Sequence, residues 1–394
     1  MDKMSIKDLD KKELENKTVL VRVDFNVPLK DGKVSDDTRI MAALPTIKYL
    51  TDNDAKVVLV SHLGRPKGKD TKNSLKNIAD YINEKTEIKV KFLDDCIGED
   101  VQKRVKEGKA GEIFLLENVR FYPEEEKNDA DFAKKLAKLA DIYVNDAFGT
   151  AHRAHASTEG VTKYLPAYAG LLMEKEIEFL SKALNPQKPF VAIIGGSKIS
   201  SKIGVLKNLV EKTDTLIIGG AMTYTFLKSL GQSVGKSLVE DDSIDTAKEI
   251  MAKAEKLKCK LIIAEDHVIA ASIDDERGKV SENIPADMSA FDIGPKTIEK
   301  VKVELEKAKT VVWNGPMGVF EKPAFANGTN EVAKILAGLK DKGVITIVGG
   351  GDSVAAIEQV GLTDKFSHIS TGGGASLEFL EGIELPGIKA IKNK

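Results

Sequence analysis

Short apolar runs recur along the chain, roughly every 30 residues, with stretches of helical periodicity between them. The run Val57–Val60 in KVVLVSHLGRP lacks the alternation of a half-exposed strand, which is typical of a parallel strand buried on both faces. Similar runs occur in TVLVRVDFN, EIFLLENVR and DIYVNDAFG in the first half, and in FVAIIGGSK, TLIIGGAM, KLIIAEDH, TVVWNGPMG, VITIVGGGD and HISTGGGAS in the second. We therefore predict an α/β fold with two doubly wound, Rossmann-like parallel sheets.

A single amphipathic segment separates the two sets of strands. YAGLLMEKEIEFLSKAL (168–184) has apolar residues at helical spacing, with Pro166 before it and Pro186 and Pro189 after it. We interpret it as a connecting helix over residues 170–184. This predicts a first domain over 1–169 and a second over 185–383, and 394 residues are enough for two cores.

Charge and cysteine content narrow the possible partners. The 59 basic and 61 acidic residues nearly cancel, which argues against a nucleic acid or a membrane surface as the main partner. Cys96 and Cys259 lie far apart without metal or redox spacing, and the charged N-terminal segment does not resemble a signal peptide. No apolar run approaches the roughly 20 residues that span a bilayer. We expect a cytoplasmic protein with small-molecule ligands.

Cationic and polar residues follow the strands of the first half, at the edge where open parallel sheets bind ligands. They are Arg22, Asp24, Asn26, His62, Arg65, Arg120 and Arg153, with Arg39 in the next segment. Several arginines converging with one histidine would suit a small polyanion, because the guanidinium holds carboxylate or phosphate by paired hydrogen bonds. A solvated loop residue remains an alternative for Arg65, and turn capping for Asp24. We do not interpret His152 and His155 as metal ligands, because no nearby group completes a set.

Glycines take the corresponding positions in the second half. They occur in GGSK (195–198), GGAM (219–222), NGPMG (314–318), GGGDS (349–353) and GGGAS (372–376). Glycines at helix starts expose backbone N–H groups that favour phosphate, which suggests a nucleotide. Lys198 and Lys202 would share one face of the first helical turn if a helix begins near Ser197, and a solvated lysine face is the alternative. Asp352 could hold Mg²⁺ or simply cap a helix.

Two familiar nucleotide motifs are absent. LGQSVGKS (230–237) resembles a P-loop, but only three residues separate its glycines instead of four, and no strong strand precedes it. The fingerprint G-x-G-x-x-G is missing from every glycine cluster, which weakens a dehydrogenase interpretation.

Taken together, the motifs resemble those of the phosphoglycerate kinase family. They are RVDFNVPL, SHLGRPKG, ENVRFYPEE, NDAFGTAHRAHAS, GGSKISSKI, WNGPMGVFE, GGGDSVAA and STGGGASLE, and in order they cover essentially the whole chain. The resemblance implies the glycolytic transfer of a phosphoryl group between 1,3-bisphosphoglycerate and ADP, giving 3-phosphoglycerate and Mg-ATP. It also implies a monomer whose C-terminal tail, 384–394, returns to the first domain.

The resemblance further implies a role for each matched residue. Asp24, Asn26, Arg39, His62, Arg65, Arg120 and Arg153 would bind 3-phosphoglycerate. On the nucleotide side, Lys202, Asn314, Gly350, Gly351 and Ser353 would lie at the phosphates, Asp352 at Mg²⁺, Glu321 at the ribose, and Gly220, Ala221 and Gly294 at the adenine. Arg39, Lys198 and the amides of Gly372, Gly373 and Gly374 would surround the moving phosphoryl group. Ser353 replaces the family's usual threonine and Ser197 its frequent alanine, which affects only fine nucleotide contacts.

The implied chemistry needs no general base, because the nucleophile toward ATP is a carboxylate that is already ionised near neutral pH. Catalysis would come from positioning and from charge neutralisation, and the two domains should close only when both substrates are bound. The connecting helix and HISTGGG would flank the hinge. Another α/β enzyme, such as a nucleotide-dependent ligase or dehydrogenase, and a non-catalytic binding protein are the alternatives. A coupled assay with ATP and 3-phosphoglycerate separates all three.

Overall fold

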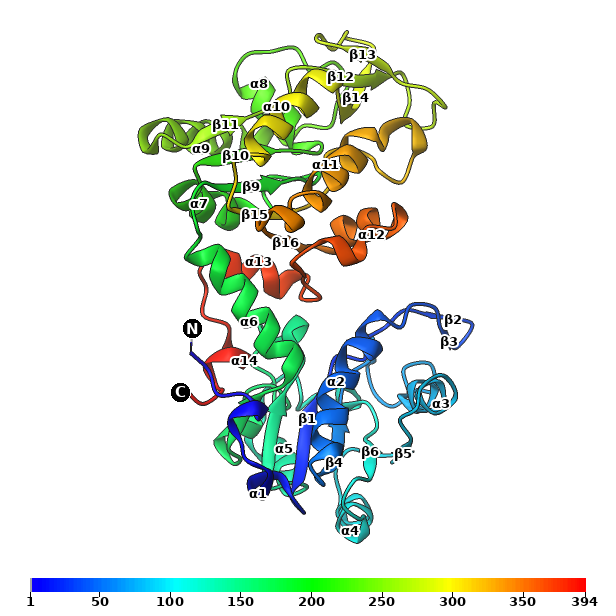
Figure 1. Ribbon diagram of the computed structural model, residues 1–394. Coiled ribbons are helices and arrows are strands. Elements are labelled where there is room, and N and C mark those ends of the chain that lie inside the picture. The colour runs from blue at the N-terminus through cyan, green and yellow to red at the C-terminus, as the bar shows by residue number, and fades with distance from the viewer. Residues whose placement is uncertain (1) are drawn as a thin grey trace. The chain divides into compact units, whose positions relative to one another are not determined.

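The computed structural model describes residues 2–394, which form two compact units (Figure 1). The first unit extends to Glu178 and also contains Glu384–Lys394, and the second comprises Phe179–Ile383. The boundary between them falls within helix α6 (Leu171–Leu184).

The first unit is built on a six-stranded parallel sheet. In spatial order its strands are β5 (Val90–Phe92), β6 (Ile113–Leu115), β4 (Lys56–Val60), β1 (Thr18–Arg22), β7 (Ile142–Asn145) and β8 (Ala167–Ala169). A short hairpin, β2 (Leu29–Lys30) with β3 (Lys33–Val34), lies outside this sheet. The chain moves from β1 toward β4 and later returns to β7 on the other side of β1, so the direction of winding reverses at β1. Ligands bind such sheets at the carboxyl ends next to this reversal.

Both faces of the first sheet are buried, as the uninterrupted apolar runs predict. Val19, Val21, Val57 and Leu59 belong to one core cluster, whereas the alternate strand residues, such as Val58 and Val60, belong to another. The helices of this unit are η1 (Ile6–Asp8), α1 (Lys11–Leu14), α2 (Thr38–Asp52), α3 (Lys76–Lys85), α4 (Glu99–Glu107), η2 (Val119–Phe121), α5 (Ala130–Ala137), η3 (Phe148–Thr150), η4 (Gly160–Lys163) and α14 (Pro386–Lys389). Residues of α2 and α3 join the first cluster, and residues of α4 and α5 the second.

The C-terminal segment is part of the first unit. The backbone N–H of Lys392 donates to the carbonyl of Ala167 at the edge strand β8, and that of Gly387 donates to Ala151. A Cβ atom at Gly387 would lie 2.9 Å from the Cα of Ala151, so glycine allows the close approach.

The second unit contains another six-stranded parallel sheet. Its strands, in spatial order, are β11 (Lys260–Ile262), β10 (Thr215–Ile218), β9 (Phe190–Ile194), β15 (Thr310–Asn314), β16 (Ile345–Gly349) and β17 (His368–Ile369). Numbered along this sheet, the order is 3-2-1-4-5-6, that of dinucleotide-binding folds, with the reversal of winding between β9 and β15. The expectation of two doubly wound parallel sheets is confirmed.

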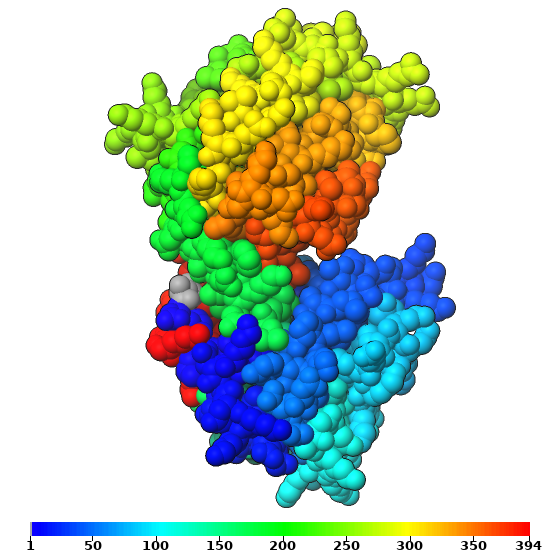
Figure 2. Space-filling model, viewed as in Figure 1, coloured from blue at the N-terminus to red at the C-terminus, as the bar shows by residue number. Residues whose placement is uncertain are grey.

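Helices cover both faces of this sheet, and Figure 2 shows the yellow and orange atoms of α10 and α11 on one side of the unit. The helices are α7 (Ile203–Lys212), α8 (Met222–Ser229), η5 (Asp241–Ser243), α9 (Ile244–Leu257), α10 (Pro295–Leu305), η6 (Pro323–Phe325), α11 (Asn327–Ala337), η7 (Lys340–Lys342), α12 (Gly351–Gln359), η8 (Thr363–Lys365) and α13 (Gly374–Leu380). Trp313 and Val311 on β15 pack in one cluster with residues of α10 and α11.

Several elements escape the sequence analysis. They are the edge strands β5 and β8, the hairpin β2–β3, and a three-stranded antiparallel sheet of β12 (His267–Ala270), β13 (Lys279–Ser281) and β14 (Ser289–Ile293). The apolar stretch that begins at residue 168 is therefore the end of β8 followed by α6. Within residues 2–394, no helix combines the length and the apolar character that crossing a membrane requires.

Candidate active site

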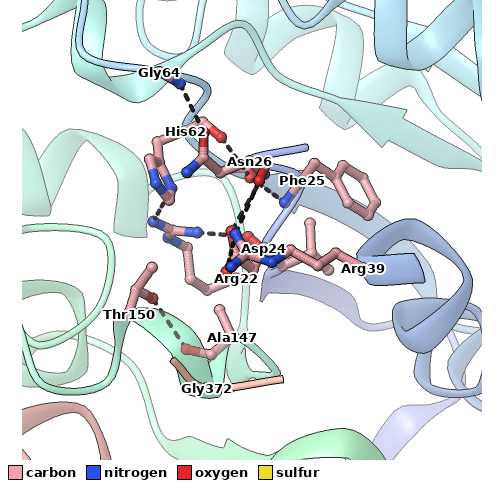
Figure 3. A network of polar contacts seen from close by, with 12 residues as sticks. Arg22, Asp24, Phe25, Asn26, Arg39, His62, Gly64, Ala147, Thr150 and Gly372 are labelled. Carbon is pink, nitrogen blue, oxygen red and sulfur yellow. Dashed lines mark hydrogen bonds and ion pairs between the residues drawn. The ribbon is translucent and has the colours of Figure 1, made fainter. Parts of the chain in front are cut away.

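Arg22 and His62 meet at the carboxyl end of the first sheet (Figure 3). Arg22 is the last residue of β1, and its Nη2 lies 3.1 Å from Nδ1 of His62, which follows β4 by two residues. A guanidinium only donates hydrogen bonds, so Nδ1 accepts and the proton of the neutral ring lies on Nε2. Burial lowers the pKa of His62 well below its usual value, and the charges of nearby arginines add to this effect. These arginines are Arg22, Arg120 and Arg39.

Two buried hydrogen bonds in series hold Arg22 in place. Its Nε donates to Oγ of Ser157 at 2.8 Å, and this hydroxyl donates to Oε1 of Glu125 at 2.5 Å. Burial raises the pKa of Glu125, and the positive charge of Arg22 opposes that rise. Arg22 is recognisable in the sequence as a strand-end arginine, but no local pattern indicates Ser157 or Glu125 as its partners.

The backbone of Gly64 joins two of the predicted acid-binding residues, Asn26 and Arg120. Its N–H donates to Oδ1 of Asn26 at 2.9 Å, and its carbonyl accepts from Nη1 of Arg120 at 2.8 Å. Nη1 of Arg39 donates to the carbonyl of Asn26 at 2.8 Å and lies 3.3 Å from Oδ2 of Asp24. Of the residues labelled in Figure 3, Arg22 ends β1, Asp24 and Asn26 follow it, Arg39 lies in α2, and His62 and Gly64 lie in the loop after β4.

Two further arginines flank this cluster. Arg153 is exposed, and its Nε donates to Nε2 of His152 at 3.1 Å. The buried His155 has its pKa lowered to about 4 by burial and by the charges of Arg120, Arg22 and Arg153. Arg65 is exposed immediately after Gly64, and its charge contributes to lowering the pKa of Arg120. Repulsion among these cations is relieved when an anion binds.

In the second unit, glycine-rich strand ends meet where the winding reverses. A Cβ atom at Gly315 would lie 2.2 Å from the carbonyl oxygen of Gly195, so the ends of β9 and β15 approach as only glycines allow. The carbonyl of Gly315 accepts from Nε1 of Trp313 at 2.8 Å. The backbone N–H of Gly315 donates to the buried Oγ of Ser353 at 2.6 Å. A serine in place of the family's threonine keeps this hydroxyl.

Lys202 lies beside the same glycines. Its Nζ donates to Oδ1 of Asn314 at 2.5 Å, at the end of β15. Burial lowers the pKa of Lys202 to about 8, and the charge of Asp352 partly opposes the shift.

A cleft of about 490 Å³ opens beside these strand ends. Four of the predicted nucleotide residues line it, namely Gly220, Ala221, Glu321 and Asp352. The sequence analysis missed several other lining residues, including Tyr224, Lys236, Leu238 and Phe291. Lys236 belongs to the segment 230–237, which was rejected as a P-loop. It reaches the cleft because this segment packs against the small antiparallel sheet, where the N–H of Lys236 donates to the carbonyl of Met288.

Three of the other predicted glycines lie at the starts of helices. Gly350 and Gly373 precede the first residues of α12 and α13, and both have positive φ. Gly294 is the buried N-cap residue of α10 and is not among the lining residues of the cleft within the described part of the chain.

Lys198 and Lys202 do not share a first helical turn, because the helix start near Ser197 on which that interpretation depended is not found. Helix α7 begins at Ile203, Lys202 is its N-cap residue, and Lys198 is exposed in the preceding loop. Gly196 has φ of +130°, and the N–H of Ser200 donates to the carboxylate of Glu240. These features favour a loop over an earlier helix start.

Asp352 lies within the first turn of α12, after the N-cap residue Gly350, so the alternative that it is the helix N-cap is also wrong. Its side chain is exposed on the wall of the cleft.

Comparisons with known proteins agree with this geometry. A sequence model described as phosphoglycerate kinase matches residues 6–383. The chain is 56% identical to a phosphoglycerate kinase of Dictyoglomus turgidum over the full length of both, and 56% identical to a cytosolic phosphoglycerate kinase of Nicotiana tabacum, covering 99% of this chain and 98% of the relative. The solved phosphoglycerate kinase from Coxiella burnetii superposes with a TM-score of 0.89 at 43% identity, over 98% of each chain. The chain therefore belongs to the phosphoglycerate kinase family and transfers a phosphoryl group between 1,3-bisphosphoglycerate and ADP.

Proposed function

We propose that the cationic cluster of the first unit binds 3-phosphoglycerate. The set is Asp24, Asn26, Arg39, His62, Arg65, Arg120 and Arg153. The observation that carries the proposal is a linked set of contacts beside the neutral His62. Arg39 donates to the backbone of Asn26, and Asn26 and Arg120 both bond to the backbone of Gly64. Arginines paired only with backbone carbonyls or long ion pairs keep donors for a phosphate and a carboxylate. Calorimetric titration of 3-phosphoglycerate in the absence of nucleotide tests the assignment.

The nucleotide occupies the cleft of the second unit in this proposal. Lys202, Asn314, Gly350, Gly351 and Ser353 lie at the phosphates, Glu321 at the ribose, and Gly220, Ala221 and Gly294 near the adenine. The charge of Lys202 at the switch point between β9 and β15 supports this orientation, because phosphates bind at that position in such sheets. Lys198, Arg39 and the amides of Gly372, Gly373 and Gly374 act on the transferred phosphoryl group.

Asp352 is the protein ligand of Mg²⁺ in this scheme. A single exposed carboxylate on the wall of a nucleotide cleft fits this ion, which commonly keeps several waters and phosphate oxygens in its shell. When bound, Mg²⁺ supplies charge neutralisation for the phosphate oxygens. The residues of the chain position the two substrates, and no side chain has to remove a proton, since the acceptor is a carboxylate.

Nucleotide affinity should fall as the pH rises through about 8, the pKa of Lys202. Below that pH the ammonium is charged and attracts phosphate, whereas above it the amine is neutral. Calorimetry with metal-free ADP from about pH 7 to about pH 9 should show Kd rising by up to tenfold per pH unit above the pKa. Lys202→Arg, which stays charged throughout, should remove this dependence. A flat profile for the unaltered protein would contradict a phosphate-binding Lys202 with a pKa of about 8.

Closure of the two units should require both ligands. The acid and the nucleotide bind to different units in this proposal, so neither ligand alone gains from drawing them together. Small-angle scattering should show a smaller radius of gyration with 3-phosphoglycerate and Mg-ADP together, a pair that cannot react. A full decrease with nucleotide alone would contradict this mechanism.

We also propose that the protein acts as a monomer and that it works in the cytoplasm, the latter in line with the cytosolic phosphoglycerate kinase of Nicotiana tabacum. Light scattering tests the first statement and cell fractionation the second. The coupled assay with ATP and 3-phosphoglycerate measures the activity itself.

A further inference from the structure

Asn118 makes three side-chain hydrogen bonds beneath the proposed acid site. It lies in the motif ENVRFYPEE, of which the proposed function uses only Arg120. The side chain is fully buried, and its Nδ2 donates to the carbonyls of Leu63 and Asn73, each at 2.8 Å. Its Oδ1 accepts from the N–H of Arg120 at 3.0 Å. Only one orientation of the amide satisfies two carbonyls and one N–H, so the donors and the acceptor are assigned by chemistry.

These bonds close the loop 63–73 into a ring. Asn118 ties together its two ends, Leu63 and Asn73, which are ten positions apart. A Cβ atom at Gly64 would lie 2.2 Å from Oδ1 of Asn73, and the N–H of Asn73 donates to Asp70 at 2.7 Å. Gly64 and Asn73 therefore approach each other as closely as a glycine allows.

The neighbouring residue Glu117 fixes the chain just beyond the ring. Its buried carboxylate accepts from Oγ of Ser74 at 2.6 Å and from the N–H of Leu75 at 2.8 Å. It also accepts from the N–H of Asn118 at 2.8 Å. Asn118 therefore closes the ring, and Glu117 anchors the chain where it leaves the ring.

Both arginines, Arg65 and Arg120, are connected to the ring. Arg65 lies within it, directly after Gly64, whose carbonyl accepts from Arg120. Asn118 holds the carbonyl of Leu63 on one side and the backbone of Arg120 on the other. We propose that Asn118 is a positioning residue that fixes Arg65 and Arg120 relative to each other, and thereby sets the affinity for the three-carbon acid phosphate. This inference rests on the proposed acid site.

The test compares two Asn→Asp variants. Asn118→Asp keeps the size of the side chain but removes both donors and places a carboxylate against two carbonyls. The matched control is Asn83→Asp on α3, whose amide likewise bridges to the backbone, donating to the carbonyl of Val90 and accepting from its N–H. We expect Asn118→Asp to raise KM for 3-phosphoglycerate about tenfold, with kcat changed less than about twofold. KM for ATP should stay constant, and Asn83→Asp should leave both KM values unchanged.

Limited trypsin digestion reads the loop directly. Lys67 and Lys69 lie in the ring, and cleavage after them should be at least about fivefold faster in Asn118→Asp than in the unaltered protein or Asn83→Asp. If Asn118→Asp does not fold, Asn118→Ser serves instead, because its hydroxyl is too short to reach both carbonyls and adds no charge. Unchanged KM for 3-phosphoglycerate or unchanged loop cleavage in a folded Asn118 variant would overturn the inference, as would an equal rise in KM in Asn83→Asp.

Arg65→Ala separates this inference from the proposed site. It removes a proposed substrate contact while leaving the bonds of Asn118 intact. If Arg65→Ala leaves KM for 3-phosphoglycerate unchanged, the site assignment fails, whatever the loop does. If Arg65→Ala raises KM and a folded Asn118 variant does not, the positioning role fails and the site assignment stands.

Discussion

Lys198→Ala is expected to lower kcat about 10²–10³-fold, because a cation that meets the phosphoryl group in transfer stabilises the transition state more than the bound substrates. Lys198 lies in the exposed loop between β9 and α7, so its removal leaves the core intact. Steady-state kinetics in the direction of ATP consumption give kcat and both KM values.

Lys207→Ala is the matched control for this prediction. Lys207 is an exposed lysine on the following helix, with its Nζ 3.4 Å from Oε2 of Glu249. Its replacement should leave kcat unchanged. If Lys198→Ala instead raised KM strongly at constant kcat, Lys198 would serve only in binding.

Gly315→Ala is expected to lower the free energy of unfolding by about 3 kcal/mol or more. Alanine is strained in the left-handed backbone conformation at this position, and its Cβ would clash with the neighbouring strand end. Gly315 has φ of +94°, and an added Cβ would lie 2.2 Å from the oxygen of Gly195 and 3.0 Å from Nζ of Lys202. The strand ends would have to separate, and nucleotide binding should weaken with them. Urea unfolding followed by circular dichroism, with ADP calorimetry on the folded variant, gives both quantities.

Gly343→Ala isolates the backbone part of that effect. Gly343 has φ of +78°, and a Cβ there would meet nothing within 4 Å. We expect a loss of about 1–2 kcal/mol and unchanged ADP affinity. Equal losses of stability in the two variants would show that the approach of β9 and β15 is not tight.

The central strands could be predicted from sequence because both of their faces are buried, which leaves uninterrupted branched runs such as Val57–Val60. Edge strands carry a weaker signal. β8 reads Ala-Tyr-Ala and merges with the helical pattern that follows, and β5 has only three residues with Lys91 exposed at its centre.

Some residues of the candidate site could likewise be predicted from the sequence, and others could not. Arginines and glycines at strand ends are visible in the sequence, since parallel strands bring their carboxyl ends to one edge. The start of α7 is not visible, because Glu240 satisfies the N–H of Ser200 from 40 positions away. The hydrogen bonds of Asn118 to Leu63 and Asn73 span 55 and 45 positions. No local sequence pattern indicates contacts at such distances.

Trp313 is the source of the protein's tryptophan fluorescence. It is the only tryptophan in the sequence, and it is fully buried on β15 with its indole N–H bonded to the carbonyl of Gly315. Tryptophan emission therefore originates in the second unit alone, one residue from Asn314. Fluorescence reports the environment of the glycine-rich strand ends, whereas the first unit has no tryptophan signal and must be followed by other probes.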